Sequence, residues 1–297
     1  MSASPAAAAT PHEGPELEFL GLDTLWLQLA GTVCNIACLH CFITCGPKNT
    51  SHPIMQTAHA LATIREGAAR GVKEYYFTGG EPFLHEDLFL IIEETLKHGP
   101  LTILTNGMLI TDEVARRLGE LFRASPYSLD LRISLDGVSP EENDPIRGKG
   151  TFDKILAGAQ NALRHGINPI FAVTTVHAEY VEVEGRQSFM GMLRQRGFAP
   201  PRLKLIPPFK IGREQRRSCG YSEREVLTQD DLLPDEAWTL QCGSSRMVTA
   251  KGVYPCPILI EEPDTKMGDT LADGLKPIRL SHPACHTCHV EGFSCRS

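Results

Sequence analysis

The chain has 297 residues, of which 42% are apolar and 22% are charged, and its formal net charge is −7. This composition is ordinary for a water-soluble globular protein, and the length allows one large domain and one small one. The acidic balance and the scattered Lys and Arg residues exclude a surface that follows a phosphate backbone, so we expect no nucleic-acid partner. No apolar run approaches the ~20 residues that cross a bilayer, so we expect no membrane partner.

Residues 1–19 are rich in Ala, Pro and Ser and have neither the basic start nor the apolar centre of a signal peptide. We therefore predict a disordered lead-in and a cytoplasmic location. In that compartment the ten cysteines of the chain are rarely paired as disulfides. Metal binding is the leading explanation for them.

The middle of the chain alternates β-rich segments with amphipathic segments of helical period. The expected strands are 24–30, 72–78, 101–105, 129–135, 169–176 and 202–207. Four helices end with a basic residue and a glycine, which suit the negative end of a helix and the left-handed turn that stops it: Arg70-Gly71, His98-Gly99, His165-Gly166 and Arg196-Gly197. This alternation predicts an α/β fold with a parallel sheet, either a partial barrel or an open doubly wound sheet.

Polar segments follow the first four strands. They are CNIACLHC, TGGEP, TNG and SLDG, in chain order. Because the carboxyl ends of the strands build the active site of β/α barrels, these segments favour a barrel with one shared pocket. Within them, Asn106-Gly107 and Asp136-Gly137 are interpreted as ordinary turn pairs.

Three cysteines stand close together after the first strand, with Cys34, Cys38 and Cys41 spaced x3 and then x2. Thiolates are soft ligands that favour zinc, copper(I) or iron–sulfur clusters. A closed zinc site takes four ligands, usually as two Cys-x2-Cys pairs. Three thiols instead leave one iron of a four-iron cluster open, and that iron can bind a cofactor.

Together with Gly79-Gly80-Glu81-Pro82 after the next strand, this cysteine motif resembles the radical S-adenosylmethionine (SAM) superfamily. The resemblance implies a partial (β/α)6 barrel over residues 20–218. It also implies a [4Fe-4S] cluster whose open iron chelates the amino and carboxylate groups of SAM, and cleavage of SAM to a 5′-deoxyadenosyl radical. An external electron donor such as flavodoxin or ferredoxin would reduce the cluster.

The resemblance also implies contacts with SAM. His40 would lie against the adenine, and the segment Gly79, Gly80 and Glu81 would accept hydrogen bonds from the amino group. Ser134 would reach the ribose or carboxylate, Arg147 would clamp the carboxylate, and the backbone of Leu205 and Ile206 would line the adenine. Simpler interpretations stay open for three of these residues. His40 and Arg147 can be surface loop residues, and Ser134 a strand-end serine.

Residues 219–297 resemble the twitch domain, a short form of the SPASM auxiliary-cluster domain, with a β-hairpin around Ala250-Lys251-Gly252. Four of its five cysteines would hold one auxiliary [4Fe-4S] cluster: Cys242, Cys256, Cys285 and Cys288, with Cys295 able to replace one of them. Two auxiliary clusters would need 3 + 4 + 4 = 11 thiolates, and the chain has ten cysteines. A structural zinc ribbon is the alternative for this region.

The resemblance leaves the substrate open. We favour a small hydroxylated or aminated molecule of the sugar or cyclitol type and a net two-electron oxidation, with the auxiliary cluster as electron acceptor. A radical epimerase is an alternative, with Cys45 or Cys219 as hydrogen donor. A peptide-modifying maturase is another, less favoured because about twenty residues precede the first strand. A non-catalytic protein that senses metal or redox state is the third.

The segment 207–225 joins the two expected domains and is rich in cations. They include Lys210, Arg213, Arg216 and Arg217. The segment is either a binding site for an anionic or hydroxyl-rich ligand or a solvated linker.

Overall fold

A computed structural model describes residues 14–232 and 237–295. Its main sheet has the strand order β7-β6-β5-β4-β3-β2-β8-β9. The six predicted strands are confirmed to within two residues at each end, and all are parallel: β2 Thr24–Gln28, β3 Glu74–Thr78, β4 Leu101–Thr105, β5 Leu129–Ser134, β6 Ile170–Thr174 and β7 Arg202–Ile206. The order is open between β7 and β9, so the partial barrel is confirmed.

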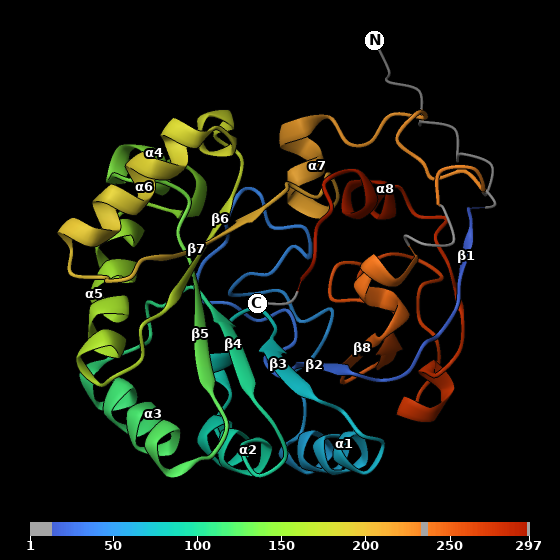
Figure 1. Cartoon of the computed structure of the whole chain (residues 1–297), viewed down its shortest axis with the longest axis horizontal. Helices are drawn as coiled ribbons and strands as arrows, with labels where there is room; N and C mark the ends of the chain where they lie inside the picture. The colour runs from blue at the N-terminus through green and yellow to red at the C-terminus, as the bar shows by residue number, and fades with distance from the viewer. Residues whose placement is uncertain (1–13, 233–236, 296–297) are drawn as a thin grey trace.

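Helices cover the convex side of this sheet (Figure 1). The α-helices are α1 Thr57–Ala69, α2 Leu88–Thr95, α3 Asp112–Ala124, α4 Pro140–Arg147, α5 Thr151–Arg164, α6 Val183–Gln195, α7 Gly212–Ser218 and α8 Pro283–Val290. Short 3-10 helices are η1 Pro82–Leu84, η2 Ala178–Val181, η3 Ala237–Thr239, η4 Gln241–Gly243 and η5 Leu271–Gly274. Helices α7 and α8 lie apart from the others, near the open side of the barrel (Figure 1).

Strand side chains alternate between the helices and the concave interior. Leu25, Tyr75 and Leu131 are buried in the main apolar core with the helices. The residues that follow them in sequence face inward. Of these, Trp26 and Tyr76 stack with ring centroids 4.2 Å apart, and the guanidinium of Arg132 lies 5.5 Å from the Tyr76 ring. The interior is therefore polar enough to form a site.

Three of the four predicted helix ends are confirmed. Helices α1, α5 and α6 stop at a basic residue followed by Gly71, Gly166 or Gly197, whose φ angles are 86°, 93° and 91°. The fourth prediction is wrong, because α2 ends at Thr95. Gly99 lacks the positive φ and packs closely instead, since a Cβ there would lie 3.2 Å from the Lys73 carbonyl oxygen.

The carboxyl-terminal part adds to the barrel sheet. Strand β8 (Ser245–Thr249) pairs in parallel with β2, and β9 (Gly252–Tyr254) pairs antiparallel with β8, as the predicted hairpin requires. Strand β1 (Glu16–Leu17) pairs antiparallel with β10 (Ile278–Arg279). The prediction of disorder over 1–19 is therefore wrong for 14–19, where Leu17 is buried in an apolar cluster. Residues 1–13 lie outside the described residues.

No helix in the described part of the chain is both long and apolar enough to span a membrane.

Candidate active site

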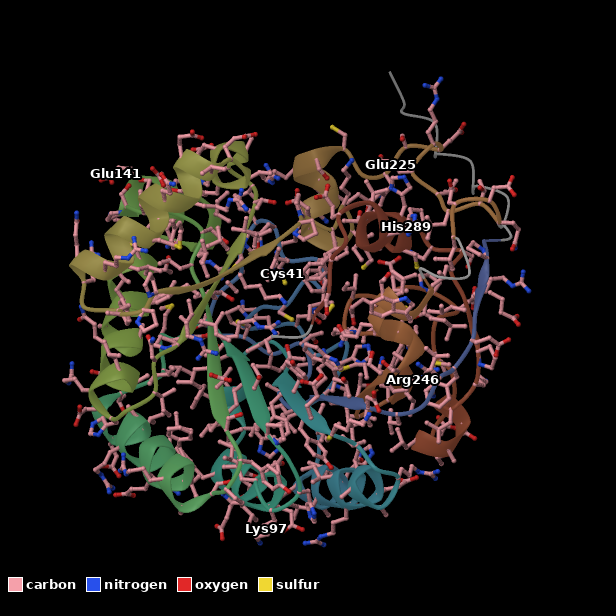
Figure 2. All side chains as sticks on the ribbon, in the orientation of Figure 1. Cys41, Lys97, Glu141, Glu225, Arg246 and His289 are labelled. Atoms are coloured by element: carbon pink, nitrogen blue, oxygen red, sulfur yellow. The ribbon has the colours of Figure 1, made fainter. Side chains whose placement is uncertain are left out.

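A cavity of about 200 Å³ lies at the carboxyl ends of the parallel strands. The loop after β2, residues 33–46, supplies its cysteines and is called the cluster loop below. Cys34, Cys38, Cys41 and also Cys45 line this cavity. A bridge between Val33 and Gly46 closes the base of the loop. Cys41 lies near the middle of the molecule, whereas Lys97 lies at its edge (Figure 2).

Each sulfur of the predicted ligand triad has a hydrogen-bond donor beside it. Asn106 Nδ2 lies 3.8 Å from Cys34 Sγ, and Arg147 Nη1 lies 3.9 Å from Cys38 Sγ. The Cys45 thiol hydrogen-bonds to Cys41 and, more than the nearby charge of Arg213, lowers the pKa of Cys41 to about 6. Hydrogen bonds to sulfur tune iron–sulfur clusters, so this surrounding fits a cluster.

Among the described residues, no three His, Cys, Asp or Glu groups converge closely enough to hold one metal ion. A zinc ion needs its thiolates within ~2.3 Å of one point. A four-iron cluster takes each cysteine on a different iron and so needs them farther apart.

Gly79 and Gly80 follow β3 and support the cluster loop. A Cβ on Gly80 would lie 1.9 Å from the Val33 carbonyl oxygen, and one on Gly79 would lie 2.9 Å from the Ala30 nitrogen. Gly79 also has a φ of 149°, where L side chains are rare. Both glycines line the cavity. Their lack of a side chain is needed because the backbone at 79–80 contacts the backbone of Ala30 and Val33.

Glu81 is fully buried and does not line the cavity. Its carboxylate accepts hydrogen bonds from the Thr105 hydroxyl at 2.7 Å, the Asn106 backbone N–H at 2.8 Å and the Phe83 backbone N–H at 3.2 Å. Burial raises the pKa of Glu81 to about 7, against the lowering effect of these bonds. The side chain thus joins the ends of β3 and β4, and the contact of the Gly79-Gly80-Glu81 segment with the SAM amino group stays a prediction.

Asp136 organises two of the predicted SAM contacts. Its carboxylate lies 2.5 Å from His40 Nε2 and 2.7 Å from Arg147 Nε, and it accepts the Thr174 N–H at 2.9 Å. Burial alone would raise the pKa of Asp136, but Arg147 and His40 hold it well below its usual range. His40 and Arg147 line the cavity, His40 largely and Arg147 fully buried, and both contact Asp136, so neither is a free surface residue.

Strand alternation separates two other predicted residues. Ser134 and Ile206 line the cavity. The Leu205 side chain instead packs against the main core on the helix side, so the adenine contact that the resemblance assigns to its backbone stays a prediction.

Two residues interpreted as turn residues belong to the site. Asn106 lines the cavity, and its Nδ2 also donates to Asn35 Oδ1 at 2.7 Å. Asp136 is the buried partner of Arg147 described above. The signal that both share was present in the sequence, since each follows directly after a predicted strand.

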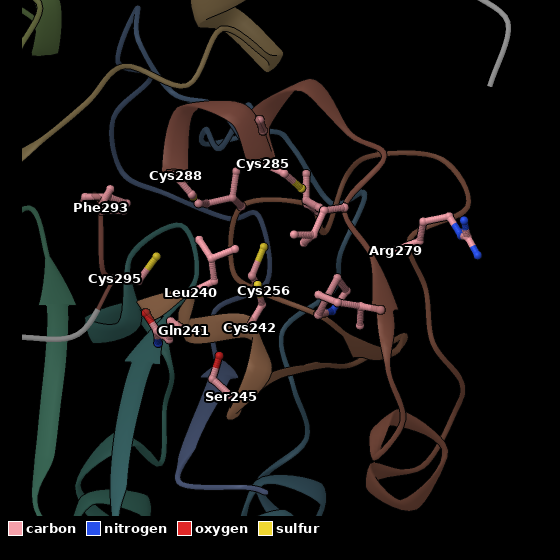
Figure 3. Close-up of a pocket in the computed structure, with 16 residues that line it drawn as sticks. Leu240, Gln241, Cys242, Ser245, Cys256, Arg279, Cys285, Cys288, Phe293 and Cys295 are labelled. Atoms are coloured by element: carbon pink, nitrogen blue, oxygen red, sulfur yellow. The ribbon is translucent and has the colours of Figure 1, made fainter. Parts of the chain in front are cut away.

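The five carboxyl-terminal cysteines surround a second cavity (Figure 3). Cys242 and Cys256 flank the hairpin, Cys285 and Cys288 lie on α8, and Cys295 is the last described residue. Burial raises the pKa of each thiol. Ile258, Phe293 and Cys295 line both cavities, so the two share a wall.

Arg246 on β8 is a buried cation beside this second cavity. Its guanidinium donates to the main-chain carbonyls of Cys242, Ser245, Gly274 and Lys276. Burial lowers its pKa to about 10, and the thiols of Cys242 and Cys256 act in the opposite direction. A cluster held by four thiolates carries negative charge, so a buried arginine next to two of them fits such a cluster.

Three cations of segment 207–225 have internal partners. Lys210 pairs with Glu225 at 2.5 Å and Arg217 with Glu214 at 2.7 Å. Arg213 donates to carbonyls of the cluster loop. These contacts disfavour the predicted site for an anionic ligand in this segment.

Comparison with known proteins decides the family. A model described as the radical SAM superfamily matches residues 30–184, which is more than half of the chain. The chain belongs to the radical SAM superfamily. The match covers the cluster loop, β3 with its Gly-Gly-Glu-Pro segment, and the strands up to β6.

Among its relatives, the mycofactocin maturase MftC of Mycolicibacterium smegmatis is 35% identical over 269 residues, covering 81% of this chain and 66% of that protein. A GTP 3′,8-cyclase of Clostridium botulinum is 26% identical over 208 residues, covering 68% of this chain and 63% of that protein. The chain therefore spans somewhat less than two thirds of these relatives.

Two solved structures share the fold. Native anSMEcpe with bound AdoMet and Cp18Cys peptide has a TM-score of 0.60 at 17% identity, covering 92% of this chain and 84% of that one. Streptococcus suis SuiB has a TM-score of 0.60 at 14% identity, covering 86% of this chain and 66% of that one. At these identities the likeness concerns the fold alone.

Proposed function

We propose that the protein is a radical SAM maturase that oxidises a residue of a peptide substrate. The maturase relative supports the substrate class, because it is 35% identical over most of this chain. This choice replaces the sugar or cyclitol substrate favoured by the sequence. The number of residues before the first strand does not bear on what the barrel itself can bind.

The cluster and SAM, when bound, supply a 5′-deoxyadenosyl radical that removes one hydrogen atom from the substrate. Cys34, Cys38 and Cys41 would hold the cluster. Arg147 and Ser134 line the same cavity and would contact SAM. Asp136 fixes Arg147 in place, so the arginine meets the cofactor without a large loss of side-chain entropy.

The single observation that carries the oxidation is the wall shared by the two cavities. Phe293, Ile258 and Cys295 line both cavities, and Cys295 is itself one of the carboxyl-terminal cysteines. A substrate residue bound in the first cavity would lie against this wall. An auxiliary cluster behind the wall would supply an acceptor for the second electron, and a proton would go to solvent, which balances a two-electron oxidation.

The spare thiols support oxidation over epimerisation. Cys219 is exposed at the end of α7, away from the cavity wall. Cys45 lines the cavity, but its thiol is hydrogen-bonded to Cys41. Neither is an unengaged hydrogen donor facing the cavity.

The test compares two substrate classes under the same anaerobic conditions, with SAM and dithionite. One arm contains a synthetic precursor peptide of the mycofactocin type, and the other contains an aminocyclitol. We expect 5′-deoxyadenosine and a peptide lighter by two hydrogen atoms in the first arm only. Oxidation of the aminocyclitol, with the peptide unchanged, would contradict the proposal and identify the protein as a small-molecule dehydrogenase.

A further inference from the structure

Arg213, near the start of α7, contacts the cluster loop with its whole guanidinium. Its Nε donates to the Cys38 carbonyl at 2.7 Å, its Nη1 to the Thr44 carbonyl at 2.8 Å and its Nη2 to the Cys45 carbonyl at 2.5 Å. Its backbone N–H donates to the Cys41 carbonyl at 3.0 Å. One residue therefore binds four carbonyl groups along the loop that carries the ligand thiols.

The backbone before Arg213 is shaped for this contact. Gly212 has a φ of 59°, and a Cβ there would lie 2.2 Å from the Phe42 carbonyl oxygen. Ile211 is buried with Phe209, and Phe42 packs against both. Apolar packing and a glycine thus place α7 directly on the cluster loop.

We propose that Arg213 is a positioning residue for the SAM-binding cluster: it fixes the curvature of the cluster loop and supplies a positive charge beside Cys38 and Cys41. A guanidinium presents its donors in a rigid planar fork, so it can bind three carbonyls that face it from different directions. An ammonium group of similar length cannot reach all three at once. The charge matters separately, because reduction adds an electron to the cluster and a nearby cation favours that state.

Arg213 also connects the cluster loop to the carboxyl-terminal part of the chain. Helix α7 follows the last barrel strand and precedes the segment that leads to the auxiliary cysteines. A movement of that segment would change the hydrogen bonds between Arg213 and the cluster loop. This inference depends on membership of the radical SAM superfamily and not on whether the substrate is a peptide.

Two substitutions separate geometry from charge. Arg213→Lys keeps the charge but loses the fork, and Arg213→Gln loses the charge and most of the fork. The matched control is Arg216→Ala, which removes an exposed arginine from the same helix. Each full-length protein is reconstituted anaerobically, and thermal unfolding checks that it is folded.

The readouts are iron content, SAM affinity and the change that SAM produces in the electron paramagnetic resonance spectrum of the reduced cluster. For Arg213→Lys we expect SAM affinity to fall by about tenfold or more, the range found when residues that hold metal ligands are replaced. For Arg213→Gln we also expect a more negative reduction potential of the SAM-responsive cluster. Arg216→Ala should match the wild type in every readout.

Wild-type SAM affinity and spectrum in Arg213→Lys would overturn the role of the fork. A wild-type potential in Arg213→Gln would overturn the role of the charge. If Arg213→Gln fails to assemble a cluster, Arg213→Lys alone decides the role of the fork, and wild-type SAM affinity and spectrum in that variant would overturn it.

Discussion

The two cysteine sites of this protein are held in different ways. The cluster loop is surrounded by polar side chains from several elements: Asn106 after β4, Arg147 on α4 and Arg213 on α7. The second cavity has mostly apolar walls, including Ile258, Ala284 and Phe293, with Arg246 as its buried cation. The first site presents donors to a cofactor that must enter and leave, whereas the second is insulated.

This difference predicts how each site responds to change. Substitutions around the cluster loop should alter SAM binding and potential while the fold survives. Substitutions around the second cavity should alter stability and electron transfer while SAM binding survives. The predictions below break or sharpen this contrast, beginning with the largest effect.

Replacing Cys34, Cys38 or Cys41 with Ala should abolish SAM cleavage, because two remaining thiolates do not hold the cluster. Iron should fall by about four atoms per chain, the content of one four-iron cluster. Iron analysis and chromatography of 5′-deoxyadenosine make the measurement. Continued formation of 5′-deoxyadenosine in any of the three variants would refute the role of that cysteine.

Replacing Cys285 and Cys288 together with Ala should also remove about four iron atoms per chain, but SAM cleavage should continue. Product formation should stop, since the second electron has no acceptor. The control is Cys219→Ala, which removes an exposed cysteine. Unchanged iron together with lost zinc would establish a structural zinc site instead.

Arg246→Met should lower the free energy of unfolding by ~3 kcal/mol or more, because each buried carbonyl left without its donor costs ~1–3 kcal/mol. Four carbonyls lose their donor in this variant. Arg279→Ala, at an arginine that is half exposed, should change the free energy by less than about 0.5 kcal/mol. Denaturant unfolding compares the two. If Arg246→Met and Arg279→Ala changed the free energy of unfolding equally and only slightly, the second site would not be insulated as described.

Glu81→Gln should lower the free energy of unfolding by ~1–3 kcal/mol at neutral pH, because the NH₂ group of the new amide would face a hydrogen-bond donor. The pKa of Glu81 is raised from 4.5 to about 7 in the folded state. The folded protein therefore binds more protons between these values, so wild-type stability gains a contribution as pH falls from 7 to 4.5. This contribution should be absent in Glu81→Gln. A parallel pH dependence of both proteins would show that the Glu81 carboxylate does not titrate in this range.

The sequence predicted the barrel well because its signals are local. Strand periodicity, the Arg-Gly helix ends and the cysteine spacing all act over a few residues. The end of α2 was missed because Gly99 is required for packing against Tyr75 and Lys73, a contact between different elements.

The site was predicted less completely because much of it depends on distant pairs. His40 meets Asp136, 96 positions away, and Arg213 meets Cys38, 175 positions away. Asn106 and Asp136 each follow directly after a predicted strand, but each also precedes a glycine, a pair that is typical of turns. Likewise Glu81 lies in a recognised motif, but its partners Thr105 and Asn106 lie on the next strand.

The central claim is that a peptide in the first cavity is oxidised across the shared wall. Mass spectrometry of the peptide product formed in deuterated water tests it most directly, with 5′-deoxyadenosine counted in the same sample. We predict a product with two hydrogen atoms fewer, no solvent deuterium bound to carbon, and one 5′-deoxyadenosine per product. A product that instead keeps its hydrogen count and gains one deuterium at carbon would contradict the account and establish an epimerase.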